Sequence, residues 1–291
     1  MPALIDVVLP AFFAIFIGYL VGKFMKLNMA PVVDLTLYIG VPALVFTSLL
    51  GKEIIITEAA KIWAAALTVM LGCGLIAYLV FRVLRQRHSG LYVSVLVMNT
   101  VNLPFPILYL AYGAAAMVPA TLFYIPNVFM VFSVGIFIMS GGRKESLREV
   151  LKQPVIWAAI IGLALNFLHV SVPKLIVTSL DLVAQMAIPV VLIVLGHNLS
   201  KVRLSSLPTT LLASFLRMGV GLGLGLLMAW ALGLTGLDRS VVIIVSAMPA
   251  AANASILATK YNNEPELVSS VVFLTTVASL GTIPLLLHFF G

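Results

Sequence analysis

The chain has 291 residues, of which 62% are hydrophobic and only 9% are charged, whereas a soluble domain carries about 25% charged residues. This composition excludes a soluble globular protein and favours an integral membrane protein. The formal charge of +7 does not indicate nucleic-acid binding, because the basic residues lie in short loops between apolar blocks, where such residues set membrane topology.

The apolar blocks predict an all-α integral membrane protein with ten transmembrane helices, since about 20 apolar residues cross a bilayer. The first block lacks a basic leading segment and a cleavage site, so it is expected to be a retained helix and not a signal peptide. In chain order the predicted helices are 3–22, 33–50, 60–81, 91–112, 117–140, 154–170, 175–196, 207–232, 239–259 and 266–290.

The distribution of Lys and Arg supports this helix count and predicts the orientation. With ten crossings, the loops after the first, third, fifth, seventh and ninth helices share one side of the membrane. That side holds Lys23, Lys26, Arg82, Arg85, Arg87, Arg143, Lys144, Arg148, Lys152, Lys201, Arg203 and Lys260, and the other holds Lys52, Lys61, Lys174 and Arg239. The basic side is expected in the cytoplasm, so both termini would face the periplasmic side of the inner (plasma) membrane.

The two halves of the chain share a pattern of interruptions. The second and seventh predicted helices each contain a proline, Pro42 and Pro189, and the fourth and ninth each break their apolar run with proline and asparagine. Five helices separate the copies, so the second copy would enter the membrane from the opposite side as an inverted repeat. The predicted division is 1–141 for the first repeat, 142–153 for a cytoplasmic linker and 154–291 for the second repeat. Coincidence remains the alternative, because proline is common in transmembrane helices.

The interruptions predict a binding site. Proline lacks a backbone N–H and clashes with the carbonyl four residues earlier, so Pro104 and Pro106 are expected to break the fourth helix, and Pro249 the ninth. The exposed N-terminal ends of half-helices favour anions and the carbonyl ends favour cations. Two such breaks that meet would bind a small solute without any charged side chain.

Polar residues beside the breaks are the candidate ligands of that solute. Amides both donate and accept hydrogen bonds; the alternative is that these residues cap half-helices or bond between helices. Serines such as Ser246 and Ser255 are weaker candidates, because serine often bonds within its own helix. The predicted substrate-binding residues are Asn99, Thr100, Asn102, Pro104, Pro106, Arg217, Ser246, Pro249 and Asn253.

Arg217 lies deep inside the eighth predicted helix, where an ionisable residue by default suggests function. It could attract an anionic substrate, extend its charge to the interface or bond to a helix C-terminus. The nearby glycines at 219, 221, 223 and 225 favour close helix packing. No Asp or Glu falls near the middle of a predicted helix, which argues against a carboxylate proton relay. No catalytic motif is present, so an enzyme is not expected; no cofactor is expected either, and a coupling ion, Na⁺ or H⁺, is left open.

Four stretches carry a family resemblance: Asn99-Thr100-Val101-Asn102-Leu103-Pro104, Ile39-Gly40-Val41-Pro42, Leu195-Gly196 and Met248-Pro249. Together with the helix pattern, they resemble the auxin efflux carrier family, in particular its compact bacterial members, often called malate or dicarboxylate permeases. The resemblance implies the fold of bile acid/sodium symporters and sodium/proton antiporters, with helices one, two, six and seven as a scaffold, often dimeric, and the others as a moving transport domain.

The resemblance also implies an organic-anion transporter that works by alternating access, with elevator-like motion and a substrate site where the fourth and ninth helices cross. The small apolar run Ala250–Ala252 after Pro249 departs from a polar lining. The alternatives are a sodium-coupled symporter of the bile-acid type and a membrane sensor that binds a ligand without moving it. The expected partners are the lipid bilayer, a small organic anion and a second copy of the chain, and not a nucleic acid.

Overall fold

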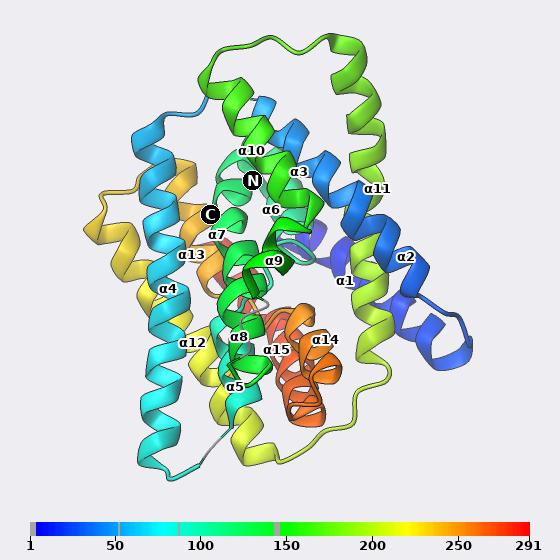
Figure 1. The fold of residues 1–291 in the computed structure, drawn as a ribbon, viewed down its shortest axis with the longest axis vertical. Coiled ribbons are helices and arrows are strands. Elements are labelled where there is room, and N and C mark those ends of the chain that lie inside the picture. Colours follow the sequence, from blue (N-terminus) through cyan, green and yellow to red (C-terminus); the bar gives the residue numbers. More distant parts are fainter. Residues whose placement is uncertain (1–3, 52, 87, 143–145) are drawn as a thin grey trace.

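The computed structural model describes residues 4–51, 53–86, 88–142 and 146–291, and over these residues every element is a helix (Figure 1). One isolated antiparallel bridge, between Met98 and Ala250, is the sole β-type pairing among them. The α-helices are α1 (Leu4–Phe24), α2 (Ala30–Leu35), α3 (Val41–Leu50), α4 (Ile56–Val83), α5 (Ser89–Leu96), α6 (Pro104–Tyr112), α7 (Met117–Met130), α8 (Ile136–Met139), α9 (Ser146–Leu151), α10 (Pro154–Phe167), α11 (Lys174–Leu199), α12 (Leu207–Ala231), α13 (Gly236–Ser246), α14 (Ala252–Lys260) and α15 (Pro265–Phe290).

Seven helical stretches in the described part of the chain are long and apolar enough to cross a membrane. They are Val7–Phe24, Ala30–Leu50, Ile56–Val83, Pro104–Met139, Lys174–Leu199, Leu207–Ala231 and Pro265–Phe290. Helix α10 is apolar but has only 14 residues, and α5, α13 and α14 are half-helices that are too short to cross alone. The chain is therefore an all-helical, multi-pass membrane protein.

Two local features differ from the sequence-based expectation. The predicted helix 33–50 contains a π-helical turn, η1 (Thr36–Gly40), which ends two residues before Pro42. The Val41 N–H bonds to Thr36 O across this turn, which accommodates a proline that cannot bond in the α-helical register. A second π turn, η3 (Val131–Gly135), divides the predicted helix 117–140.

The 3₁₀ turn η2 (Gly113–Ala116) separates α6 from α7 at the predicted loop. Other segments differ from the expectation. Helix α10 ends at Phe167 and not at 170, because the chain turns at His169, whose φ is +53°. The short helix α9, which the sequence did not predict, lies within the expected linker 142–153; residues 143–145 of that linker lie outside the described residues.

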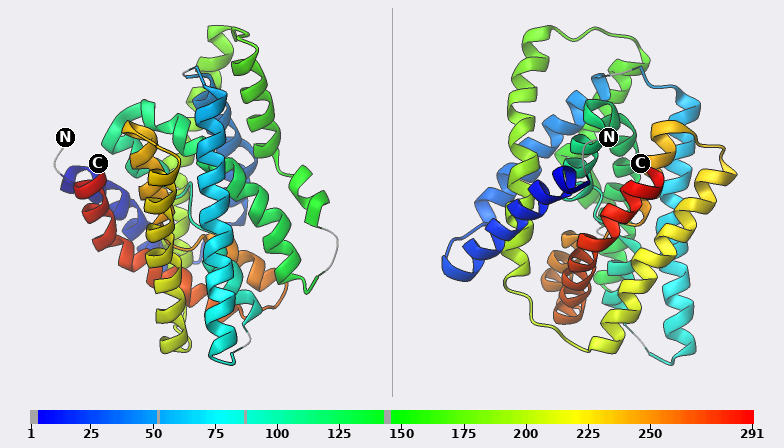
Figure 2. Two further views of the ribbon diagram at one scale, coloured as in Figure 1. Left: turned by 90° about the vertical axis from the view of Figure 1, so that its left-hand side faces the viewer. Right: turned by 180° about the vertical axis from the view of Figure 1, so that it is seen from behind.

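Helices α1, α2–α3, α10 and α11 pack against one another as one group, and α4, α7, α12, α13 and α15 form a second (Figures 1 and 2). We call the first group the scaffold. Glycine allows its closest contact: a Cβ at Gly196 would collide with Ile15 O, and one at Gly18 would collide with Ile193 O. Helices α1 and α11 can approach this closely only because both positions lack a side chain.

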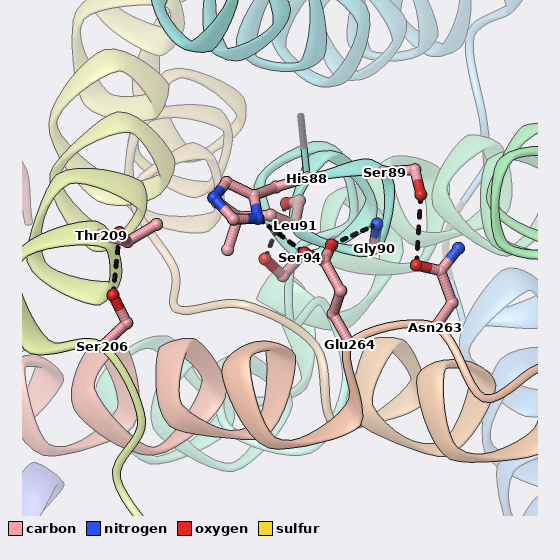
Figure 3. A network of polar contacts seen from close by, with 9 residues as sticks. All are labelled: His88, Ser89, Gly90, Leu91, Ser94, Ser206, Thr209, Asn263 and Glu264. Atoms are coloured by element: carbon pink, nitrogen blue, oxygen red, sulfur yellow. Dashed lines mark hydrogen bonds and ion pairs between the residues drawn. The ribbon is translucent and has the colours of Figure 1, made fainter. Parts of the chain in front are cut away.

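A polar network fixes the start of α5 against the turn between α14 and α15 (Figure 3). The Glu264 carboxylate lies 2.6 Å from His88 Nδ1 and accepts a 3.0 Å hydrogen bond from Gly90 N. Beside it, Ser89 Oγ donates to Asn263 Oδ1 at 3.1 Å. A carboxylate at the N-terminus of α5 satisfies free N–H groups of its first turn. This network joins the start of α5 to the turn after α14.

Candidate functional site at two meeting helix breaks

The predicted interruptions are present, and they meet. Helix α5 ends at Leu96 and α6 begins at Pro104, while α13 ends at Ser246 and α14 begins at Ala252. Between these gaps Asn99 N donates to Pro249 O at 2.8 Å, and Ala251 N donates to Val97 O at 3.1 Å. Backbone that leaves helical geometry inside a membrane protein must be satisfied by protein. Here each gap supplies partners to the other.

Side chains from two further helices hold the gaps in place. Asn127 of α7 donates through Nδ2 to Met98 O at 3.2 Å and to Thr100 Oγ1 at 2.8 Å. Thr275 of α15 accepts a 3.2 Å hydrogen bond from Ala250 N. Asn99 Oδ1 accepts from Leu103 N at 3.4 Å. Asn99 and Thr100 are therefore buried and hold the gap between α5 and α6 in place. This agrees with the alternative interpretation, in which these residues cap half-helices or bond between helices.

Asn127 and Thr275 bond to the two gaps, and neither is among the residues predicted from the sequence. Asn127 had a signal, because it follows Pro126 and so repeats the proline–asparagine pairing that marked the two breaks. Thr275 had no signal in the sequence. Its hydroxyl also donates to Val271 O and Val272 O of its own helix, as threonines do in many helices.

The two half-helix N-termini differ in what they offer to a ligand. In α6, Pro104 and Pro106 carry no N–H, and Phe105 N donates to Val101 O at 3.2 Å. The first turn of α6 therefore presents no free donor. In α14, the N–H groups of Ala252 and Asn253 have no partner among the described residues. Free N–H groups at a helix N-terminus are an anion-binding arrangement, so α14 is the end that fits an anion.

The start of α14 adjoins a small cavity of about 30 Å³. The cavity contains the predicted site residues Asn102 and Asn253, and with them Asn198 of α11 and Thr36 of η1. It therefore lies between the scaffold and the interrupted helices. Of the four asparagine and threonine candidates, the structure brings these two asparagines together at one cavity and places Asn99 and Thr100 outside its lining.

A larger cavity of about 710 Å³ adjoins the small one, and the two share the lining residues Leu195, Asn198, Ala252 and Ile256. We call the larger cavity the vestibule. Its lining residues come from the loop after α11, from α14 and from the start of α15, and the loop after α11 lies in the lower part of Figure 1. Its charged lining residues are the basic Lys201, Arg203 and Lys260 and the acidic Glu266. Predominantly basic walls raise the local concentration of anions.

A third cavity, of about 1,090 Å³, lies between α1, α3 and α11 of the scaffold and α6 and α7. Pro106 is among its lining residues, together with Asp181 and Gln185 of α11. Pro104, in contrast, is buried at the start of α6. The interrupted region thus has cavities on two sides, and the predicted site residues are divided between them.

Arg217 is fully buried, with 0% of its surface exposed, and it lines none of these three cavities. Its guanidinium donates from Nη1 to Val95 O at 2.8 Å and from Nη2 to Ser246 O at 2.7 Å. Of the three interpretations that the sequence left open, bonding to helix C-termini is the one that the structure shows. Two other predicted site residues form these contacts through their main chain. Ser246 O accepts from Arg217, and Pro249 O accepts from Asn99 N.

Long apolar helices, two interrupted helices that meet, and cavities on either side of the meeting point define a multi-pass membrane protein of the transporter class.

Comparisons with known proteins agree. The family described as "Membrane transport protein" matches residues 143–287. An "Uncharacterized transporter" of Methanocaldococcus jannaschii is 25% identical over 96% of this chain and 96% of its own length. A second "Uncharacterized transporter", of Methanothermobacter thermautotrophicus, is 28% identical over 85% of this chain and 84% of its own.

A further relative, from Rhizobium meliloti, carries the name "Putative malonate transporter" and is 24% identical over 99% of this chain and 96% of its own length. The matched family and the names of all three relatives describe membrane transport. The chain is accordingly a transporter and not an enzyme.

Proposed function

We propose that the protein is a secondary transporter that moves a small organic anion by alternating access, through elevator-like motion of the interrupted helices against the scaffold. One observation carries the proposal: Ala252 and Asn253, whose main-chain N–H groups are free, line a cavity that Asn102 also lines. A site at the junction of two helix groups changes its exposure when one group moves against the other.

The chemistry of the cavity favours a small carboxylate. Two main-chain N–H groups, a helix N-terminus and amide side chains all interact favourably with negative oxygen atoms. The basic vestibule would attract such an anion before it binds. The side chains of Ala250–Ala252 are small and apolar, so they offer few polar contacts to a solute, which favours a compact one. The relative named for malonate, a short dicarboxylate, agrees with this class.

The topology that we propose for this function has ten crossings in two inverted repeats. Ten crossings result when the stretch Pro104–Met139 is divided at η2, so that α6 forms one crossing with α5 and α7–α8 form the next, and when α10 and α13–α14 also cross. Residues 1–141 and 154–291 are then the two repeats, each with an interrupted fourth helix. The side with the loop after α11, which carries Lys201 and Arg203, would face the cytoplasm, and both chain termini would face the periplasm. We also propose that the scaffold forms a homodimer, through exposed apolar side chains such as Trp157 and Ile160 of α10.

Uptake into proteoliposomes tests the proposal directly. We expect purified, reconstituted protein to take up labelled malonate or malate, with an indole carboxylate as a bulkier comparison, and empty liposomes to take up none. A substrate also raises the apparent melting temperature of the folded protein that binds it. If no member of a broad panel of organic anions is taken up and none shifts the melting temperature, anion transport is the wrong function for this site.

A further inference from the structure

The C-terminal ends of the half-helices α5 and α13 both contact Arg217 of α12 near the interruption, and both need a positive partner. The last carbonyls of a helix have no intrahelical donor, and each C-terminus carries roughly half a negative charge. In α13, Ile243, Ile244 and Val245 accept from the main-chain N–H groups of Ala247 and Met248. Ser246 O is left over, and so is Val95 O in α5; Arg217 binds both.

Arg217 has no counter-ion in the described part of the chain, since no ion pair there includes it. Arginine keeps its charge in proteins, so a full positive charge is buried with only helix ends to balance it. Two C-termini with about half a negative charge each match that single positive charge. Nε of Arg217 is buried without a hydrogen-bond partner, so the two Nη contacts are what hold the guanidinium.

The sequence of α12 is adapted to bring this guanidinium to the carbonyls. A Cβ at Gly221 would collide with both Arg217 Nη2 and Ser246 O. A Cβ at Gly225 would lie 2.5 Å from Ser246 Cβ. Both glycines thus let the end of α13 lie directly against α12, in reach of Arg217. The glycine run that the sequence attributed to helix packing serves this contact at two of its positions.

Carriers with interrupted helices use free half-helix carbonyls to bind a coupling cation such as Na⁺. In this chain a covalently attached cation occupies two such carbonyls. We propose that Arg217 is a resident cation and a positioning residue: its guanidinium joins the ends of α5 and α13 and replaces a coupling cation, so that substrate binding and transport need no sodium. The inference rests on the proposed transport function and specifies how the binding site is kept assembled.

The first experiment measures uptake by the wild-type protein in sodium chloride and in choline chloride. We expect the same rate in both salts. Sodium-dependent uptake by the wild type would overturn the inference while leaving anion transport intact. Absence of uptake in either salt would instead count against the proposed function, and the stability measurements below then decide the role of Arg217 without any substrate.

The second experiment replaces the guanidinium. Arg217→Ala should lower the melting temperature and reduce uptake by about tenfold or more, since a misplaced site loses activity steeply. Millimolar guanidinium should restore part of both, because it can occupy the vacated position between the two carbonyls. The matched control is Arg82→Ala at the exposed end of α4, which should behave as wild type and show no response to guanidinium. A variant with unchanged stability and uptake, or a loss that guanidinium does not reverse, would overturn the inference.

If Arg217→Ala does not fold, two conservative variants test whether the positive charge of Arg217 is required. Arg217→Lys keeps a positive charge, and Arg217→Met keeps comparable length without charge. We expect the Lys variant to melt at a higher temperature and to retain more uptake than the Met variant. Equal values for the two would mean that Arg217 acts through its volume, and the resident-cation inference would be wrong.

Discussion

Asn102 and Asn127 both lie near the gap between α5 and α6, but their surroundings differ. Asn102 is half-buried and lines the small cavity beside α14, with no hydrogen bond to the described residues. Asn127 is almost fully buried, and its Nδ2 bonds to Met98 O and Thr100 Oγ1. An amide without a protein partner is available to a ligand, whereas an amide that satisfies buried main chain contributes to stability.

We expect Asn102→Ala to reduce anion uptake without changing the melting temperature of the unliganded protein. Loss of one amide contact to a carboxylate should weaken apparent binding by about tenfold, which corresponds to roughly 1.4 kcal/mol. Uptake measured at several substrate concentrations, at matched protein content, shows whether the loss is in affinity. Uptake equal to that of wild type would remove Asn102 from the site.

Asn127→Ala should have the opposite profile. It leaves Met98 O and Thr100 Oγ1 without their donor inside the protein, at a cost of about 1 to 3 kcal/mol for an unsatisfied buried group. The expected result is a lower melting temperature in detergent, with uptake reduced in proportion to the folded protein that remains. Asn102→Ala, measured in parallel, serves as the comparison. A stable Asn127→Ala protein would show that the gap does not need this support.

At the scale of elements, α12 allows one substitution to be compared at two sites on a single helix. Gly225→Ala would push a methyl group into Ser246 of α13, whereas a Cβ at Gly223 meets no atom within 4 Å. We expect Gly225→Ala to destabilise the protein by about 1 to 3 kcal/mol through overpacking. Gly223→Ala should be neutral or stabilising by about 0.4 to 1 kcal/mol, since it restricts the unfolded chain.

Thermal unfolding of the two glycine variants, prepared side by side, measures the contrast. Gly225→Ala should also respond to guanidinium no differently from wild type, because Arg217 is still present. If both alanine variants unfold at the same temperature, the close approach of α12 to the end of α13 is not a requirement of the fold.

The elements that the sequence predicted well are those set by local composition. Apolar blocks located the long helices to within a few residues, and the prolines at 104, 106 and 249 located the two interruptions. The π turns, α9 and the partners of Arg217 were not predictable in this way, because they depend on which side of a helix faces which neighbour. A charged residue in an apolar helix indicates that a partner exists, but its spacing does not say whether that partner is a substrate, water or a main-chain carbonyl.

The same limit applies within the candidate site. Asn99, Thr100 and Asn102 lie within four consecutive residues, and all three are predicted substrate-binding residues. The backbone between Leu96 and Pro104 is not helical, so neighbouring side chains do not follow a helical period and point in different directions. Two of these residues therefore support the gap, and only Asn102 lines the small cavity.

At the scale of the whole molecule, the ends of α11 decide the proposed orientation. This helix has 26 residues, or about 39 Å at 1.5 Å per residue, which exceeds the roughly 30 Å hydrocarbon core. Val170 precedes it and Leu204 follows it, and both are exposed. The basic residues Lys201 and Arg203 lie at the second end, so the positive-inside rule places Leu204 in the cytoplasm and Val170 outside.

Single cysteines at these two positions test that orientation in intact cells. The buried Cys73 is the chain's one native cysteine, so Cys73→Ala gives a background without thiols. A membrane-impermeant thiol reagent should label Val170→Cys in intact cells and Leu204→Cys only after the membrane is opened, because α11 separates them across the bilayer. Labelling of Leu204→Cys alone from outside would invert the orientation, and would place the basic vestibule at the outer surface. Labelling of both from one side would mean that α11 does not span the membrane, and the count of ten crossings would then be wrong.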